Sequence, residues 1–382
     1  MDFDLSDTQR DYRDAARSVA ETRLLPEYQA RERAGRIEPE LRAEIGKLGL
    51  VAPELPVGLG GRGTDRVTSG LVVEEIGRGD INVGYLQVVG SLVGQILAGN
   101  AREEVAQQWV PTICSGEQVV GIGLTEPHAG SDAGMPRLRA VPDGGDWLLM
   151  GVKSLSFALD AAAVVVFART ADTEDRGKDI SAFLVPLDGP GVTRESYPDM
   201  GTRAVGRGAV HLDGVRVPGE YLLGAEGRGF SQVMQGFDFS RALIGLQCLG
   251  AAEQTLDETW AYVGERTAFD RPLSTNQGVA FPLAEADTLL HAARLACLET
   301  LWLKDVGRPH TTQAAMAKWW APKTAYDAIN QCLLLHGQYG YRTDLPLEQR
   351  MRDVLGLQIG DGTAQIMKLV IARQRLGRAL AP

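Results

Sequence analysis

Apolar residues recur at helical spacing through the first third of the chain. Tyr12, Ala16 and Val19 fall on one face of a helix that follows Ser6, and Gln9 stands three residues after Ser6 as in a capping box. The same spacing predicts helices near residues 41–50, 68–77, 83–99 and 101–114. We therefore expect the first third to be entirely helical.

The pattern changes near Gly116 to short apolar runs that are rich in Val, Ile and Phe. Such runs, separated by Gly-, Asp- and Pro-rich turns, predict strands over residues 119–124, 147–150, 163–168, 180–185 and 209–217. Strands at close spacing with no helices between them predict a small antiparallel barrel or sandwich rather than a parallel sheet.

The helical period returns after the glycine-rich stretch 224–230. It predicts four long helices, near residues 231–265, 275–305, 311–336 and 346–376, the last interrupted around Gly360. Helices of this length indicate an up-down bundle. The predicted fold class is α+β multidomain, with an N-terminal helical domain (1–115), a middle antiparallel β barrel (116–228) and a C-terminal four-helix bundle (229–382).

Composition narrows the classes of function. A net charge of −10 with no long basic run argues against a nucleic-acid partner. No apolar run approaches the roughly 20 residues of a membrane span, and the acidic start Met1-Asp2-Phe3-Asp4 is unlike a signal peptide, so we expect no membrane insertion. The 4 cysteines are far apart and the 5 histidines lack metal-ligand spacing, which indicates reduced core cysteines, a cytoplasmic location and no metal site.

Asp361 is the strongest candidate for chemistry, because it stands between Gly360 and Gly362. A glycine on each side lets backbone and ligand approach closely, at a cost in conformational entropy. Two interpretations are open from this stretch alone. Asp361 is either the N-cap of a helix over residues 363–376 or a general base presented to a substrate.

Five motifs, in this order, resemble those of the acyl-CoA dehydrogenase family over essentially the whole chain. They are Gly123-Leu124-Thr125-Glu126-Pro127-His128-Ala129-Gly130-Ser131-Asp132, Leu212-Asp213-Gly214-Val215-Arg216-Val217-Pro218, Arg266-Thr267-Ala268-Phe269 with Gln277, Leu335-His336-Gly337-Gln338-Tyr339-Gly340-Tyr341, and Arg352-Asp353 ahead of Asp361-Gly362-Thr363. The resemblance implies an FAD-dependent oxidoreductase, usually a homotetramer built as two dimers. It also implies an acyl-CoA substrate and an electron-transfer flavoprotein or similar acceptor as partner.

The resemblance implies two flavin-binding stretches in the β domain. Leu124, Thr125 and Ser131 would line the flavin and its pyrophosphate, and a turn rich in hydroxyl and N–H donors suits that task. The alternative for this stretch is a simple turn at the end of a strand. The run Lys153-Ser154-Leu155-Ser156-Phe157-Ala158 is about one residue shorter than the common form and lacks the aromatic residue that usually follows the lysine. Aligned with that form, Leu155 and Ser156 would contact the flavin and Ser156 would donate to N5.

The remaining cofactor contacts are implied in the C-terminal domain, with Arg266, Gln277 and the segment 336–338 acting on the cofactor of a neighbouring subunit. They are Arg266, which would reach the pyrophosphate, together with Phe269, Gln277, His336, Gly337, Gln338, Thr363 and Gln365. The alternative for Arg266 is an ordinary surface charge on a helix. The usual glycine after the aromatic residue is Asp270 here, an acid that would lie near a diphosphate.

Ser131, Asp238, Arg241, Gly360 and Gly362 are the implied substrate contacts, with Asp238 and Arg241 towards the CoA moiety. The alternative for Arg241 is a buried residue paired with an acid. In the common family form the base is a glutamate preceded by a bulky aromatic residue, whereas this chain has Gly360 and Asp361.

Asp361 would abstract the α-proton of the thioester, while the β-hydrogen leaves as hydride to flavin N5. A shorter base and a missing aromatic residue leave volume for a cyclic or α-branched acyl group, similar to the substrate of cyclohexanecarboxyl-CoA dehydrogenase. No carboxylate occurs between Ile81 and Asn100, which favours simple α,β-dehydrogenation. The alternatives are a flavin oxidase similar to nitroalkane oxidase, a dehydrogenase acting on a carrier-protein-bound acyl group, and an inactive paralogue that serves as a subunit partner.

Overall fold

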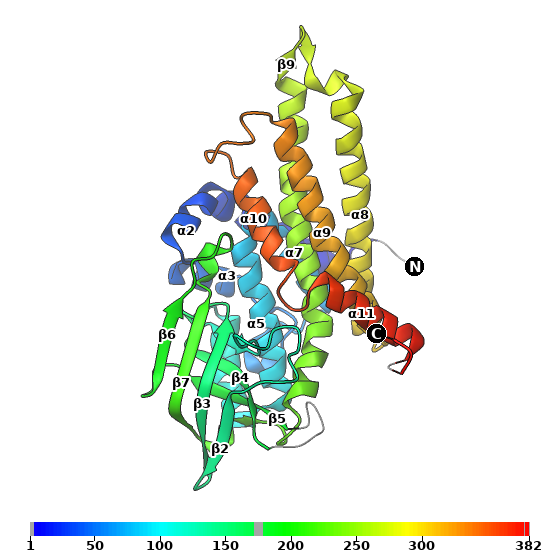
Figure 1. Ribbon diagram of the computed structural model, residues 1–382. Coiled ribbons are helices and arrows are strands. Elements are labelled where there is room, and N and C mark those ends of the chain that lie inside the picture. Colours follow the sequence, from blue (N-terminus) through cyan, green and yellow to red (C-terminus); the bar gives the residue numbers. More distant parts are fainter. Residues whose placement is uncertain (1–3, 172–178, 378, 382) are drawn as a thin grey trace.

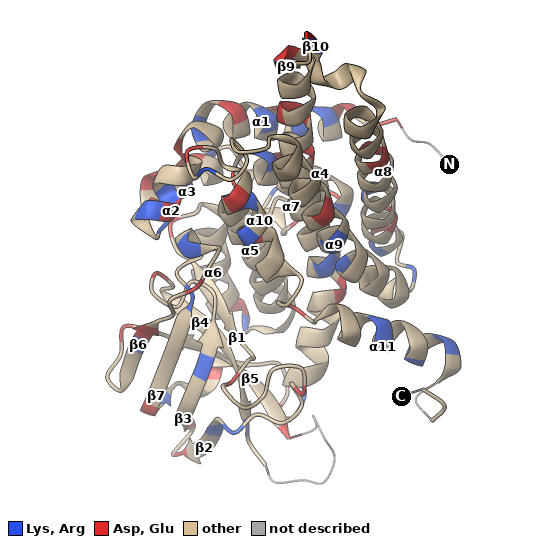
Figure 2. Cartoon of the chain, turned by 45° about the horizontal axis from the view of Figure 1, so that its top comes forward, with Lys and Arg blue, Asp and Glu red and all other residues tan. Residues whose placement is uncertain are grey.

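In the computed structural model a β sheet packs against helices from both ends of the chain (Figure 1). The structure describes residues 4–171, 179–377 and 379–381, so Met1-Asp2-Phe3 of the acidic start lies outside the described residues. Acidic and basic residues are interspersed along the helices (Figure 2). Some of them join elements that are distant in sequence, as where Arg294 Nε donates to Glu74 Oε1 at 2.7 Å.

The first third is helical, as predicted. It comprises α1 (Asp7–Val19), α2 (Tyr28–Ala34), α3 (Pro39–Lys47), α4 (Arg66–Gly79), α5 (Ile81–Asn100) and α6 (Glu103–Cys114), with short turns at η1 (Ala20–Leu24), η2 (Leu25–Glu27) and η3 (Val57–Leu59). The capping box of α1 is confirmed, because the Gln9 N–H donates to Ser6 Oγ at 3.2 Å and the Ser6 N–H donates to Gln9 Oε1 at 3.0 Å.

Helix α5 occupies the centre of the molecule, between the sheet and the C-terminal helices (Figure 1). It is the one helix in the described part of the chain that is long and apolar enough to cross a membrane. However, 83% of its apolar window is buried within the protein, as expected for a core helix.

The middle domain is a single sheet. Its strands are β1 (Val120–Gly123), β2 (Arg139–Asp143), β3 (Asp146–Leu155), β4 (Ala163–Arg169), β5 (Ile180–Pro186), β6 (Val192–Ser196), β7 (Gly208–Val217) and β8 (Leu222–Leu223), with 3-10 turns at η4 (Arg203–Val205) and η5 (Gly219–Tyr221). The strand order is β6-β7-β3-β2-β4-β5-β8, and β1 pairs with β4.

The sheet is not closed into the predicted barrel, and it is not purely antiparallel. In the described residues the edge strands β6 and β8 do not pair with each other. One edge of β4 is shared, since β1 runs parallel along residues 163–166 and β2 meets β4 only at the pair Arg139–Arg169. The sheet instead curls, so that Trp147 on β3 packs edge-on against Phe183 on β5 with ring centroids 5.2 Å apart.

The last third is a bundle of long helices. It comprises α7 (Gly229–Glu265), α8 (Gln277–Asp305), α9 (Thr311–Leu335), α10 (Leu347–Leu357) and α11 (Ala364–Leu376), with a small hairpin of β9 (Thr267–Ala268) and β10 (Arg271–Pro272) followed by η6 (Leu273–Thr275). The predicted interruption around Gly360 divides the final helix into α10 and α11. Helix α7 packs closely on α4, because a Cβ on Gly250 would lie only 2.1 Å from the Glu74 carbonyl oxygen.

Two hydrophobic cores result, one beneath the sheet and N-terminal helices and one inside the bundle. Tyr85 on α5 is half-buried and packs against both. The junction of the two cores is also where the loop between α10 and α11 approaches α7 and α9. The fold therefore brings Tyr85 and Asp361 to the same region from opposite ends of the sequence.

Candidate active site

Asp361 lies in a tight loop, residues 358–363, between α10 and α11. Its φ of 55° is in the left-handed region, which Asp tolerates better than most side chains. Gly362 follows with φ 105°, and a Cβ there would meet Met367 Cε at 2.5 Å, so this position requires glycine. The interpretation of Asp361 as a helix N-cap is wrong, because the Thr363 hydroxyl caps α11 by accepting from the Ile366 N–H at 3.3 Å.

The electrostatic surroundings of Asp361 suit a proton acceptor. Burial raises the pKa of the Asp361 carboxyl, while the charges of Lys318 and Arg241 and a hydrogen bond from Ser240 act in the opposite direction. The net result is a pKa above the ordinary value of 3.8. With its pKa raised, this acid holds a transferred proton better than an exposed aspartate does.

Arg241 lies beside the loop and is paired with an acid, as the alternative interpretation proposed. Its NH1 donates to Asp238 Oδ1 at 2.9 Å, and its side chain is only 8% exposed. Asp238 also accepts from the Thr311 hydroxyl at 2.5 Å. The assignment of Asp238 and Arg241 as CoA contacts stays a prediction, since each side chain already has a partner within the chain.

Lys318 on α9 was missed in the sequence. The residue is 1% exposed, and Nζ donates to the Leu357 carbonyl oxygen at 2.7 Å and to the Gly362 carbonyl oxygen at 3.3 Å. A lysine within the apolar run Ala314-Ala315-Met316-Ala317-Lys318 of a predicted bundle helix was the available signal, because buried lysines are rare.

Tyr85 was also missed, because the only signal taken from residues 81–100 was their lack of carboxylates. Its pKa is raised by burial and by the negative charge of Asp361, and a hydrogen bond with Ser156 acts in the opposite direction. Its ring stacks on Phe157 with centroids 6.2 Å apart. Tyr85 therefore connects Ser156 of the β domain with Asp361 of the bundle.

The segment 155–157 follows β3 and turns sharply. Ser156 is half-buried at the turn, whereas the Leu155 side chain is buried in the core, leaving only its backbone for a cofactor contact. Phe157 has φ 60°, an unusual value for an aromatic residue, and its N–H donates to the Val205 carbonyl oxygen at 3.0 Å. Left-handed backbone at both Phe157 and Asp361 concentrates conformational strain around Tyr85, as is common at functional sites.

The stretch after β1 forms an exposed loop over a buried ion pair. Thr125 and Ser131 are exposed, Leu124 is half-buried, and a Cβ on Gly130 would meet no atom within 4 Å. Beneath them Glu126 accepts from Lys153 Nζ at 2.7 Å and from the N–H groups of Arg137 and Leu138 at 2.8 and 3.1 Å. Burial would raise the pKa of Glu126, but Lys153 and the two N–H groups together lower it.

A second group of predicted cofactor residues lies far from this loop. Helix α7 starts beside β5, where the Gly227 N–H donates to Ser181 Oγ at 2.9 Å, and its 37 residues span about 55 Å before Arg266. Arg266, the 93% exposed Phe269 and Gln277 lie at this far end, next to β9 (Figure 1). His336, with Gly337 and Gln338, ends α9 at the same place and stacks on Tyr262 at 4.2 Å. Thr363 and the exposed Gln365 begin α11, at the Asp361 loop.

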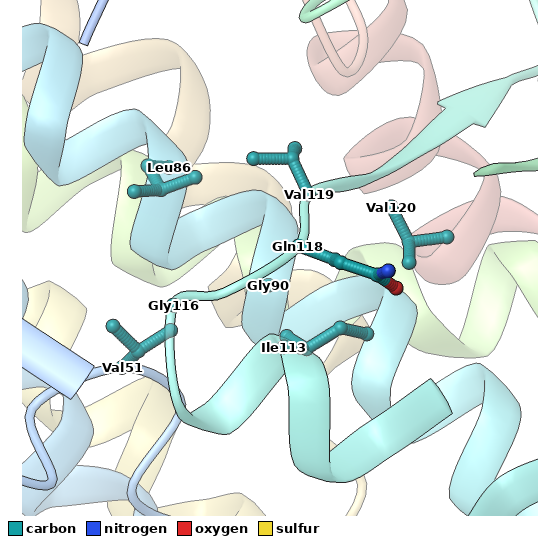
Figure 3. A pocket seen from close by; sticks show the side chains of 8 residues that line it. All are labelled: Val51, Leu86, Gly90, Ile113, Gly116, Gln118, Val119 and Val120. Atoms are coloured by element: carbon teal, nitrogen blue, oxygen red, sulfur yellow. The ribbon is translucent and has the colours of Figure 1, made fainter. Parts of the chain in front are cut away.

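Two cavities lie away from Asp361. One, of about 10 Å³, is lined by apolar and glycine positions and Gln118 where α5, α6 and the start of β1 meet, and Figure 3 shows Val51, Leu86 and Ile113 around it. It is too small for a substrate and holds at most one water. The other, of about 210 Å³, is polar and is lined by Arg78, Glu253 and His291 among others.

Comparisons with known proteins match the whole length. The N-terminal, middle and C-terminal domain models of acyl-CoA dehydrogenase match residues 6–117, 121–215 and 227–376. The probable acyl-CoA dehydrogenase YngJ of Bacillus subtilis (strain 168) is 36% identical over 380 residues, covering 98% of this chain and 100% of its own length. The butyryl-CoA dehydrogenase of Megasphaera elsdenii superimposes with a TM-score of 0.95 at 30% identity, covering 98% of this chain and 100% of that one.

A glutaryl-CoA dehydrogenase from Mycobacterium smegmatis, whose structure contains FADH2, superimposes with a TM-score of 0.92 at 29% identity, covering 98% of this chain and 96% of that one. The fold, with a helical domain, a β domain and a helical bundle, and the site therefore define an FAD-dependent oxidoreductase that acts on acyl-CoA thioesters. The chain belongs to the acyl-CoA dehydrogenase family.

The residues present fit FAD chemically. The loop 124–131 offers exposed hydroxyl groups on an open face, and such donors suit the carbonyl oxygens of a flavin ring and the oxygens of a pyrophosphate. Ser156, next to the Tyr85 hydroxyl, adds a donor at the junction with the Asp361 loop. A basic side chain such as Arg266 suits the diphosphate, but within one chain it lies at the far end of the bundle.

Proposed function

We propose that this protein catalyses the α,β-dehydrogenation of an acyl-CoA thioester with Asp361 as the base. Asp361 takes the proton of the α C–H bond, the β C–H bond breaks, and a carbon–carbon double bond forms. Bound FAD supplies the acceptor for the β-hydrogen, which leaves as hydride. The raised pKa of Asp361 supports this role, because the acid must accept a proton from a weak carbon acid.

In this proposal the backbone N–H of Asp361 also stabilises the charge that develops on the substrate. Abstraction of an α-proton places negative charge on the thioester oxygen, which a positioned N–H stabilises. The Asp361 N–H lies in the rigid turn that Gly362 and the α11 cap define, so one residue supplies both base and donor. Thr125, Ser131, Leu124 and Ser156 would hold the cofactor on the β-domain side, with the Leu155 backbone beside them.

We further propose that the acyl group is cyclic or branched at the α-carbon, as in cyclohexanecarboxyl-CoA. The observation that supports this preference is the open space at Gly360. A Cβ on Gly360 would meet only the Gly356 carbonyl oxygen, at 4.0 Å, and its backbone is not left-handed, so a side chain is compatible with this position. An absent aromatic residue there leaves volume next to the base. Gly362 and Ser131 would border the same substrate.

The competing preference is a short straight chain, as the name of the Megasphaera elsdenii relative implies.

We also propose a homotetramer in the cytoplasm, with electrons passing to an electron-transfer flavoprotein or similar acceptor. An exposed apolar stripe on α8 (Phe281, Leu289, Leu295 and Trp302) supports subunit association, and four free buried cysteines suit a reducing compartment.

Anaerobic bleaching of the oxidised-flavin absorption band tests base and substrate together. Butyryl-, octanoyl-, isobutyryl- and cyclohexanecarboxyl-CoA are each mixed with FAD-loaded protein, and we expect the cyclic thioester to bleach fastest. Asp361→Asn should abolish bleaching while FAD stays bound. Near-normal bleaching by Asp361→Asn would remove Asp361 as base, and a clear preference for butyryl- or octanoyl-CoA would remove the cyclic assignment.

A matched pair of variants isolates the role of position 360. Gly360→Tyr fills the open space and should reverse the preference towards straight chains. Ile359→Tyr adds the same ring at the neighbouring position, whose side chain is 65% exposed, and should leave the preference unchanged. Equal effects of the two variants would contradict a pocket that begins at Gly360. Rapid reoxidation of the reduced protein by oxygen would instead favour a flavin oxidase.

A further inference from the structure

Lys318 is a buried cation without a directly paired carboxylate in the described part of the chain. It lies on α9 and contacts both ends of the loop that carries Asp361. Burial lowers the pKa of Lys318 to about 8, which reflects the cost of keeping a charge there. A side chain that served only to fill space would be apolar, so the retained ammonium requires an explanation.

The two acceptors of Lys318 lie at defined points of the loop. Leu357 is the last residue of α10, and its carbonyl belongs to the group that a helix C-terminus leaves unpaired. A cation at this end also interacts favourably with the helix dipole. The Gly362 carbonyl follows Asp361 directly, and thus Nζ holds the loop on both sides of the acid.

We propose that Lys318 is a positioning residue for the acyl-CoA dehydrogenase reaction: its ammonium holds the left-handed turn of Asp361 and keeps that carboxylate ionised in the free enzyme. The inference rests on the proposed role of Asp361 as base and adds the group that controls it. Lys318 contacts neither substrate nor cofactor in this role, and acts only through the loop and its charge.

The groups that face Asp361 come from three helices. Lys318 on α9 and Arg241 on α7 contribute positive charge, Ser240 on α7 contributes a hydrogen bond, and Tyr85 on α5 contributes a neutral hydroxyl. The charge of Lys318 opposes the effect of burial on the pKa of Asp361 more strongly than the charge of Arg241 does. Arg241 is also engaged by Asp238 at 2.9 Å, whereas Lys318 has no such carboxylate of its own in the described residues. Cys248, on α7, is buried beside Lys318, and its raised pKa keeps it neutral.

Two substitutions remove the charge with different degrees of structural disturbance. Lys318→Met keeps the length and loses both hydrogen bonds, while Lys318→Gln keeps a polar amide that donates to a carbonyl. The rate of anaerobic flavin bleaching is measured against pH for the FAD-loaded fraction of each variant. We expect both to move the acidic limb of the profile about one pH unit higher, the effect of losing an opposite charge at short range.

Lys153→Met is the matched control, because Lys153 is also 1% exposed and donates to a carbonyl and a carboxylate, yet lies beneath the loop 124–131. It should lower FAD retention and the thermal midpoint without moving the acidic limb. A purely structural role of Lys318 would give this same outcome, with an unmoved limb in both Lys318 variants, and would overturn the proposal.

Failure of the inference is separable from failure of the proposed function. If Asp361→Asn abolishes bleaching but the Lys318 variants keep the parent profile, Asp361 is the base and Lys318 does not control it. If Asp361→Asn bleaches normally, the base itself has been misassigned and the inference falls with it. A direct readout besides activity is the titration of ¹³C-labelled aspartate carboxyl groups by NMR, assigned with Asp361→Asn; the Asp361 signal should titrate at higher pH in Lys318→Met.

Discussion

The proposed base, Asp361, is one carbon shorter than the glutamate of the common family form, and its backbone accounts for part of that difference. Asp361 has φ 55°, where a short side chain that can bond locally is tolerated far better than a long one. The residue that follows is a glycine because its φ of 105° is one that other residues rarely adopt. The residue type at 361 is therefore tied to the turn as well as to the chemistry.

Tyr85 gives the sharpest prediction at the residue scale. Tyr85→Phe removes the hydroxyl next to Ser156 and Asp361 while keeping the ring stacked on Phe157. Loss of one buried hydrogen bond of about 1 kcal/mol should slow flavin bleaching about fivefold. Stopped-flow bleaching at saturating substrate measures this rate.

The control for Tyr85 is Tyr221→Phe, which removes a surface hydroxyl that donates to Gln108 Oε1 at 3.3 Å. It should leave the bleaching rate unchanged. Equal rates for Tyr85→Phe and the parent protein, with an unchanged order of substrates, would show that the Tyr85 hydroxyl takes no part in the site.

At the scale of elements, α10 is anchored by a buried acid just before the Asp361 loop. Asp353 Oδ2 accepts from the Tyr28 hydroxyl at 2.7 Å and from Asn82 Nδ2 at 3.2 Å, while Oδ1 accepts from the Thr202 N–H at 2.5 Å. These partners come from α2, α5 and the β domain. One carboxyl group thus joins all three parts of the fold.

This anchor predicts a pH dependence of stability. Burial raises the pKa of Asp353 from 3.8 to about 7, so the folded state binds its proton more tightly than the unfolded state. The stabilisation is complete below pH 3.8 and is lost as the pH rises to about 7. Thermal melts of the FAD-loaded protein between pH 5 and about 8 should show this contribution as a falling midpoint, and Asp353→Asn should flatten it.

Asp327→Asn is the control for Asp353, because Asp327 is 56% exposed and pairs only with Lys323 on the same helix. Its melting midpoint should follow the parent protein at every pH. If Asp353→Asn keeps the parent slope, the anchor does not titrate in this range, and another group causes the pH dependence.

The helices were predictable because their apolar periods are long and regular, and the break at Gly360 was visible for the same reason. The pairing of both β1 and β2 with β4 was not predictable, because pairing between strands far apart in sequence leaves no local pattern. Within the site, Asp361 and Ser156 were found from motifs. Lys318 and Tyr85 were not found, because the sequence of an apolar helix does not show which groups of other elements its single polar residue contacts.

On the whole molecule the predicted cofactor contacts fall into two separate groups. Ser156 lies near Arg241 by way of Tyr85 and Asp361, and Arg266 follows Arg241 by 25 residues, or about 37 Å, along α7. Thr125, Ser131 and Ser156 belong to the β domain, whereas Arg266 with its neighbours follows the C-terminal end of α7. No single FAD molecule bridges that length. If both groups bind FAD, each cofactor needs the β domain of one subunit and the bundle tip of another, which a symmetric dimer supplies.

Mixing two defective chains tests this arrangement. Arg266→Ala removes the predicted contact at the tip of the bundle, the region of Arg266, Phe269 and Gln277. Thr125→Trp blocks the exposed β-domain loop 124–131, so neither variant alone should retain FAD. In mixed dimers one of the two sites combines an intact loop with an intact tip, and a random one-to-one mixture should therefore regain FAD in about a quarter of its sites. Bound flavin is measured by absorbance after subunits are exchanged in mild denaturant and gel-filtered. A site built within one chain has no such route to recovery, and a mixture that stays colourless would show that the tip and the loop serve separate purposes.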